Sequence, residues 1–318
     1  MQVSKKPISS PLFGLFIGIL AVSSASLFIR FAQKEAPSLV IAAFRMALAA
    51  LVVAPFCISK FRTEIRKVTG KTRLLLLLSG VFLAFHFAVW ITSLEYTSVA
   101  SSVVLVTTAP LWVALLSPVF LKEKITRWIV FGLVVSLTGS IVVGLSSSCG
   151  FNGGYLTCQN IAATFHGKAF LGNAMALAGA FLSAGYLMVG RKVRKHVSLS
   201  SYIFSVYSVA AIVLLLLVLL TGQKASGYSA PTYLWMVALA LVPQIIGHSA
   251  FNWALKYLSA AYVSIALLGE PVGTVLLTML FLRESPTVLE LVGGILILAG
   301  IVLATRSQKV IEEVIEDI

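Results

Sequence analysis

The sequence predicts an all-α integral membrane protein, with ten transmembrane helices arranged as two inverted repeats of five helices each. Three observations support this fold class. Of the 318 residues, 59% are apolar and only 11% are charged, whereas an ordinary water-soluble domain has about 45 to 50% apolar and about 25% charged residues. Apolar runs of about 20 residues recur along the whole chain. The chain also aligns with itself at an offset of 161 residues.

Clusters of charged and turn-forming residues separate the ten predicted helices. A run of about 20 apolar residues is needed to cross a ~30 Å hydrocarbon core. Strands of a membrane barrel would instead alternate polar and apolar residues, and segments 74–78 and 212–220 are continuously apolar. The predicted helices span residues 11–32, 38–58, 73–94, 98–121, 127–146, 169–190, 201–221, 232–255, 258–282 and 287–305.

The internal repeat aligns residues 94–142 with residues 255–303 without a gap. Apolar composition alone does not produce its identities, which include Tyr96/Tyr257, Pro110/Pro271, Glu123/Glu284, Gly132/Gly293 and Gly139/Gly300. A unit with an odd number of helices forces the second copy to enter the membrane upside down. The predicted organisation is a cytoplasmic stub (1–10), a first repeat (11–146), an outer loop (147–168), a second repeat (169–305) and a cytoplasmic acidic tail (306–318).

The distribution of Lys and Arg predicts the orientation in the membrane. With the N-terminus inside, 18 of the 24 basic residues fall in cytoplasmic segments and five in outer segments, and Arg45 lies within a helix. Cytoplasmic loops of membrane proteins carry such an excess. We therefore expect both termini in the cytoplasm and a multi-pass location in the cell (inner) membrane. The expected partner of the basic loops is anionic inner-leaflet lipid rather than nucleic acid.

Two cysteines, Cys149 and Cys158, lie in the long outer loop, where the compartment can be oxidising. A Gly-Gly pair between them allows the chain to double back, which favours a disulfide. The alternative is two free thiols in the loop.

The sequence lacks the residue clusters of most enzymes. Ten of the eleven acidic residues are Glu, and the sole Asp is Asp317. The four histidines have no carboxylate within one helical turn, and no nucleophile-elbow or zinc-protease pattern occurs. We predict no metal site, no cofactor and no enzymatic activity.

Two charged side chains lie deep inside predicted helices, away from the helix ends. Arg45 lies ~10 Å inside the outer end of its helix, where a charge costs at least about 2.5 kcal/mol unless it is paired or solvated. Glu270, midway along the ninth helix, is the only acid deep in the predicted bundle. They are candidates to hold a substrate carboxylate and to bind an amine or exchange a proton. The alternative is a structural role, in which Arg45 pairs with Glu270 or with a free carbonyl.

Further candidates for substrate binding are aromatic or polar residues of the third and eighth helices. His86 and His248 fall within one residue of equivalence under the repeat, and a tryptophan follows each of them by about one turn. Aromatic walls bind amphipathic solutes, although the same rings also pack helices together. The candidates in this group are His86, Trp90, His248, Asn252 and Trp253.

Pro110 and Pro271 occupy equivalent mid-helix positions. Each removes a backbone hydrogen bond and can break its helix. A matched pair of helix breaks near the membrane midplane marks binding sites in transporters with inverted repeats. Plain proline kinks are the alternative.

The helix pattern and several motifs resemble the EamA-type branch of the drug/metabolite transporter superfamily, over residues 11 to 306. The most specific motifs are AAFRMALAALV, SLEYTSVASSVVLVTTAPLWVALLSPVFLKE and GHSAFNWALKYLSAAYVSIALLGEPVGTVLLTMLFLRE. The outer loop that carries the two cysteines is longer than this family's usual connection. The resemblance implies secondary transport of small organic metabolites, often the export of amino acids.

We therefore expect a carrier for a small amphipathic metabolite, amino-acid-like because Arg45 and Glu270 offer one group of each sign, with a coupling proton on Glu270. One alternative is an exporter of cationic drugs, in which Arg45 is structural. A membrane-embedded enzyme or a receptor scaffold is the alternative from a different class.

Overall fold

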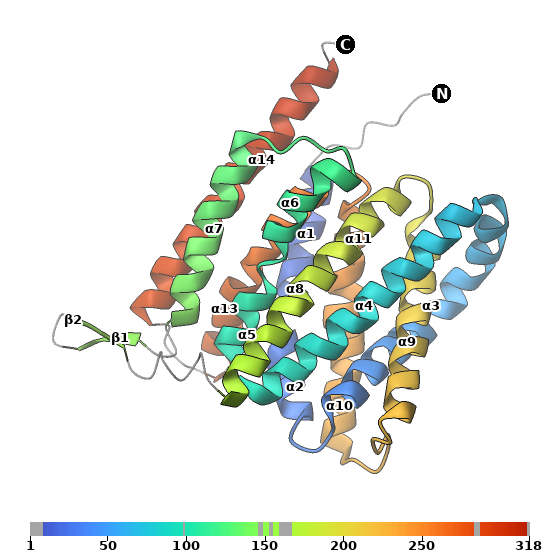
Figure 1. Ribbon diagram of the computed structural model, residues 1–318, viewed down its shortest axis with the longest axis horizontal. Helices are drawn as coiled ribbons and strands as arrows, with labels where there is room; N and C mark the ends of the chain where they lie inside the picture. The colour runs from blue at the N-terminus through green and yellow to red at the C-terminus, as the bar shows by residue number, and fades with distance from the viewer. Residues whose placement is uncertain are drawn as a thin grey trace.

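The computed structural model describes residues 9–97, 99–145, 149–152, 155–158, 167–282 and 287–316. The predicted stub (apart from residues 9 and 10), parts of the outer loop, Glu284 and Asp317 lie outside these ranges. The described chain is a helical bundle with one small β-hairpin at its edge (Figure 1).

The helices of the first half follow the predicted order. They are α1 (Ser9–Val22), α2 (Ala25–Ala32), α3 (Ser38–Lys67), α4 (Gly70–Tyr96), α5 (Val99–Val106), α6 (Ala109–Phe120) and α7 (Arg127–Leu145). Helix α3 continues to Lys67, beyond the predicted end at residue 58. Hydropathy ends at the membrane surface, but the backbone hydrogen bonds of a helix do not, so the basic segment stays helical.

The outer loop contains the strands β1 (Cys149–Asn152) and β2 (Tyr155–Cys158). They pair antiparallel with Cys149 opposite Cys158, and a disulfide joins these two cysteines. The hairpin lies beside the bundle, near the end of α7 (Figure 1).

The second half begins with α8 (Gly167–Arg194) and α9 (Leu199–Leu220). It continues with α10 (Ala230–Leu239), the π-helix η2 (Ala240–His248) and α11 (Ser249–Ala254), which form one nearly continuous span. The remaining elements are α12 (Ala260–Ala266), the 3₁₀ helix η3 (Leu267–Gly269), α13 (Glu270–Leu282) and α14 (Val288–Glu316).

By length and composition, eight helical segments of the described chain can cross a membrane. Two shorter apolar stretches, Arg127–Val143 and Leu291–Ala304, lie where the fifth and tenth helices are predicted. The protein is therefore an all-helical, multi-pass membrane protein apart from its hairpin, and the count of ten transmembrane helices stays a prediction.

Helices from the two halves pack against each other. Helix α7 runs beside α14, α4 beside α8, and α3 beside α9 (Figure 1). The α7–α14 contact depends on glycine: a Cβ built on Gly139 would lie 2.6 Å from the carbonyl oxygen of Gly293, and one on Gly132 would lie 2.6 Å from that of Gly300. Between these two contacts, the Ser136 hydroxyl donates to the carbonyl of Ile297 at 3.2 Å.

Several glutamates outside the apolar runs cap helices from elsewhere in the chain. A carboxylate at a helix N-terminus satisfies free backbone N–H groups and opposes the positive end of the helix dipole. These contacts are Glu35 to Ser229 N at 2.8 Å, Glu64 to Ser198 N at 3.1 Å, Glu95 to Ser38 N at 3.1 Å and Glu123 to Ala260 N at 3.3 Å. Four of the acidic residues are thereby assigned structural positions at helix ends.

Candidate functional site

A small cavity of about 50 Å³ lies between helices of both halves. Six of the residues predicted from the sequence line it: Arg45, His86, Trp90, Pro110, His248 and Glu270. The other lining residues were not singled out by sequence and are mainly apolar: Val22, Ala25, Val106, Thr107, Ala109, Ser183, Phe251 and Leu267. The site is therefore an apolar chamber that contains one cationic and one acidic side chain.

Arg45 comes from α3 and is completely buried. Its Nε donates to Oε1 of Gln244 at 2.9 Å, and its guanidinium carbon lies 4.0 Å from the centroid of the Phe87 ring. The aromatic face offers partial compensation for a desolvated cation. Its Nη1 has no hydrogen-bond partner among the described residues. One edge of the guanidinium is thus held by protein, and Nη1 is a buried donor that the described protein leaves unsatisfied.

Glu270 is the first residue of α13 and is 9% exposed. Its Oε1 has no hydrogen-bond partner within the described chain. Although Glu270 and Arg45 line the same cavity, no ion pair joins them. The structural interpretation, in which the two charges neutralise each other by direct contact, is not what the described residues show.

The two histidines differ in their hydrogen bonding. His86 Nδ1 donates to the carbonyl of Gly179 at 2.9 Å, because a carbonyl can only accept. This bond fixes the orientation of the imidazole ring. His248 Nδ1 has no partner among the described residues, and its ring lies 5.3 Å from that of Phe87. The two imidazoles therefore flank Phe87 from α4 and from the end of η2.

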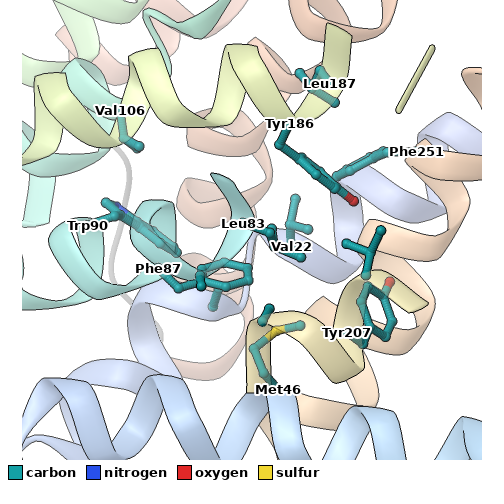
Figure 2. Close-up of a cluster of buried hydrophobic side chains, with 14 of the residues drawn as sticks. Val22, Met46, Leu83, Phe87, Trp90, Val106, Tyr186, Leu187, Tyr207 and Phe251 are labelled. Atoms are coloured by element: carbon teal, nitrogen blue, oxygen red, sulfur yellow. The ribbon is translucent and has the colours of Figure 1, made fainter. Parts of the chain in front are cut away.

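Aromatic side chains form the walls around this region. Figure 2 shows Phe87 and Trp90 of α4, with Tyr186 of α8 and Tyr207 of α9, directed into the space between the helices. Trp90 stacks on His86 with ring centroids 5.8 Å apart, and its indole nitrogen has no partner in the described chain. These rings supply a large apolar surface together with a few polar groups.

The π-helix η2 positions Gln244 opposite Arg45. A π-helix leaves i to i−4 bonds unmade and is frequent at functional sites. The backbone carbonyl of Gln244 accepts a hydrogen bond from the Tyr207 hydroxyl at 3.2 Å. That hydroxyl lies 3.0 Å from the hydroxyl of Ser249. Gln244 thus connects Arg45 of α3 with α9. Sequence reasoning missed it, although a Pro-Gln pair inside an apolar run is a detectable signal.

Both predicted helix breaks lie at the cavity. The chain leaves α5 at Val106 and resumes as α6 at Ala109, and it leaves α12 at Ala266 and resumes as α13 at Glu270. Pro110 and Pro271 each occupy the second position of the new helix, where the missing N–H would have no intrahelical partner. Each proline therefore lies at the start of the helix that follows the break. Pro110 lines the cavity, whereas Pro271, the residue after Glu270, is buried and does not line it.

Two other predicted residues lie away from the cavity lining. The Asn252 side chain is fully buried and accepts from the Tyr186 hydroxyl at 2.8 Å. Trp253 packs on α1, where its ring occupies the space that a Cβ on Gly14 would need, and it also contacts Tyr257. At the offset of 161, Trp90 corresponds to Phe251 rather than to Trp253, and Phe251 does line the cavity. In this structure the second tryptophan therefore packs against α1 and does not line the cavity, and its role in substrate binding stays a prediction.

Comparisons with known proteins agree with this architecture. The profile of the EamA-like transporter family matches the chain twice, at residues 9–145 and 170–306. The chain is 25% identical over 266 residues to the uncharacterized transporter YdfC of Bacillus subtilis, which covers 82% of this chain and 79% of that protein. It is 27% identical over 250 residues to mouse solute carrier family 35 member G1, and this match covers 75% of this chain and 64% of the mouse protein.

A crystal structure of a protein that is 18% identical superimposes with a TM-score of 0.74, covering 96% of this chain and 99% of the other. At this identity the likeness concerns the fold alone. The two profile matches together cover most of the 318 residues, and the family consists of transporters rather than enzymes. The chain belongs to the EamA-like transporter family of the drug/metabolite transporter superfamily.

Proposed function

We propose that the protein is a secondary transporter that exports a small amphipathic, amino-acid-like metabolite across the cytoplasmic membrane by alternating access. The observation that carries this proposal is the pair of unsatisfied charged groups at the central cavity. Arg45 Nη1 and Glu270 Oε1 are both buried and both lack a partner among the described residues. A solute with a carboxylate and an ammonium group would satisfy both.

The apolar walls complete the recognition. Val22, Val106 and Leu267 surround the charged groups, and they would accept the hydrocarbon part of the solute. A buried guanidinium is suited to hold a carboxylate through charge-assisted hydrogen bonds. Glu270 also supplies a proton-binding group for coupling, since an acid inside a membrane protein is by default a functional candidate.

The size of the cavity supports two conformations. A cavity of about 50 Å³ holds only a few water molecules, whereas pockets for organic ligands are usually at least about 300 Å³. Solute binding therefore requires helices to separate on one side of the site. The helix breaks at residues 107–108 and 267–269 supply two segments able to move in this way.

Contacts between equivalent residues support the inverted repeat. At the offset of 161, Gly132 corresponds to Gly293 and Gly139 to Gly300. Gly132 meets Gly300 and Gly139 meets Gly293, which is the reciprocal pattern that a two-fold axis produces. Two further pairs of equivalents touch each other directly, Ser136 with Ile297 and Phe87 with His248. Such an axis relates the antiparallel helices α7 and α14 and would lie in the membrane plane.

The proposed orientation places both termini in the cytoplasm. It follows from the excess of basic residues on one side of the membrane. The N-terminal end of α1 and the C-terminal part of α14 lie at the same end of the bundle (Figure 1).

The alternative function, export of cationic drugs through Glu270 alone, would give Arg45 only a structural role. A structural arginine in an apolar interior is expected to have its donors satisfied. The unpartnered Nη1 therefore favours a solute that carries an anionic group.

Counterflow in proteoliposomes tests the proposal. Vesicles loaded with one unlabelled L-amino acid at a time should accumulate the same labelled amino acid for at least one small apolar member of the set. Arg45→Met should abolish this accumulation, and Arg62→Met, at an exposed cation of α3, should not. Accumulation of tetraphenylphosphonium but of no amino acid would instead support the drug exporter and contradict our proposal.

A further inference from the structure

We propose that an apolar groove between α4, α6 and α8 binds one anionic phospholipid of the cytoplasmic leaflet, with its phosphate on Lys192. The groove has a volume of about 440 Å³ and is separate from the central cavity. The residues that line it include Leu78 and Phe82 of α4, Leu116 of α6, and Gly185, Met188 and Lys192 of α8. Naming the leaflet depends on the proposed orientation, whereas the site itself does not.

The shape of the groove fits one acyl chain. Its floor is formed by the buried residues Gly185 and Met188, and its rim by exposed apolar side chains such as Leu78. Along α8 the lining runs from Phe181 to Lys192, which corresponds to ~16 Å at 1.5 Å per residue. Half of the ~30 Å hydrocarbon core is ~15 Å. The groove is therefore about as long as one leaflet is deep, and Lys192 lies at one end of it, where the phosphate of a lipid in the groove would be.

The charge at the mouth of the groove favours an anionic headgroup. Lys192 is exposed and makes no ion pair in the described chain, and the same holds for Lys122, next to the lining residue Leu121. The nearby acid Glu123 is already bound by Arg191, whose Nε lies 2.7 Å from Oε1 of Glu123. The mouth therefore carries uncompensated positive charge. A single cation close to the membrane surface attracts anionic lipid with an energy of about 1 kcal/mol.

A second groove provides an internal comparison. It has a volume of about 350 Å³, lies between α1, α12, α13 and α14, and has no charged residue in its lining. It can receive acyl chains, but it offers nothing that distinguishes an anionic from a zwitterionic headgroup. The proposal therefore predicts one selective site in the molecule, at the groove that ends at Lys192.

Native mass spectrometry of the purified full-length protein, titrated with palmitoyl-oleoyl phosphatidylglycerol or phosphatidylcholine, tests the site. The wild type should bind one phosphatidylglycerol in preference to phosphatidylcholine. Lys192→Gln should reduce this preference about fivefold, whereas Lys195→Gln, at an exposed cation just beyond α8, should not change it. An unchanged preference in Lys192→Gln would overturn the proposal.

Two substitutions of matched exposure test the groove itself. Leu78, 39% exposed, lines the proposed site, and Leu20, 37% exposed, lines the uncharged groove. Leu78→Trp should remove the selective phosphatidylglycerol molecule, and Leu20→Trp should leave it bound. If Leu78→Trp retains it or Leu20→Trp displaces it, the lipid lies elsewhere and the proposal fails. Neither result bears on solute transport, so the proposed function can fail or hold independently.

Discussion

The central cavity and the α7–α14 contact are both buried between the two halves of the protein, but they are built in opposite ways. At the contact, glycines allow backbones to approach closely, and the Ser136 hydroxyl is satisfied by the facing helix. At the cavity, Arg45 and Glu270 keep polar atoms without partners among the described residues. Ser140 of α7 also keeps an unpartnered buried hydroxyl, so the difference lies in charge: unsatisfied groups cost most when they are charged, and of these two regions only the cavity offers a charged pair to a ligand.

The largest effect on stability is expected at the glycine contact. Gly293→Ala places a Cβ 2.6 Å from the Gly139 carbonyl oxygen, whereas the nearest atom to a Cβ on the neighbouring Gly294 is 3.8 Å away. Overpacking of this kind typically costs about 1–3 kcal/mol. We expect Gly293→Ala to lower the melting temperature in detergent by several degrees and Gly294→Ala to leave it nearly unchanged. Equal melting temperatures for the two variants would contradict the close contact.

Melting temperatures also test whether a two-fold axis relates the two glycine contacts. Gly132 is the proposed equivalent of Gly293, and a Cβ there would also lie 2.6 Å from a facing carbonyl oxygen, that of Gly300. Gly132→Ala should therefore destabilise the protein about as much as Gly293→Ala. A large difference between them would argue against equivalent environments.

The largest effect on transport is expected from Arg45→Met. Truncating a buried charged contact to a ligand costs about 2–5 kcal/mol, so solute counterflow should fall by about 30-fold or more. Arg45→Met also removes the donor to Gln244 Oε1, and an unsatisfied buried acceptor costs about 1–3 kcal/mol, so the melting temperature should fall by a few degrees. A variant that unfolds would instead assign Arg45 a structural role.

Glu270→Gln should affect transport more selectively. Since no ion pair joins Glu270 to Arg45 in the described chain, its removal should change the melting temperature little. Transport driven by a pH gradient should be lost while exchange between equal solute pools persists, because exchange does not require proton release from the empty carrier. If Glu270→Gln retains full pH-driven transport, the coupling role is wrong.

Much of the fold and of the candidate site could be predicted from the sequence, because the signals that define them are local. Apolar runs define the helices, a charge within such a run identifies Arg45 and Glu270, and Pro110 with Pro271 locates the helix breaks. The partner of Arg45 could not be predicted. Gln244 meets it only through the tertiary packing of α3 against the π-helix η2.

Which of the two aromatic residues after His248 reaches the cavity also depends on tertiary packing. Trp253 lies against Gly14 of α1, whereas Phe251 lines the cavity. The disulfide between Cys149 and Cys158 is expected from the sequence and is present in the structure, but the paired strands around it were not predicted, because such short strands carry no periodic apolar pattern.

The smallest effect is expected from a carboxylate whose role is purely structural. Hydrogen bonds from the Ser229 backbone N–H and from the hydroxyls of Ser229 and Thr232 lower the pKa of Glu35 below its ordinary value. A lowered folded-state pKa contributes stability above the unfolded pKa of about 4.3, and this contribution is lost as the pH falls through the folded value. Glu35→Gln should thus lower the melting temperature slightly at pH 7, and the difference should shrink below pH 4. A difference that grows with acidification would contradict the capping role.

Solute protection of a cysteine placed in the central cavity tests whether the transported solute binds there. Ser183 lines the cavity, and Ser183→Cys in a Cys57→Ser background supplies a thiol there for a small methanethiosulfonate reagent, since Cys149 and Cys158 are joined. If the solute binds at Arg45 in the cavity, the amino acid active in counterflow should slow labelling of this thiol, and Arg45→Met should remove the protection. Equal labelling rates with and without that solute, in a protein that still transports it, would show that the solute binds elsewhere.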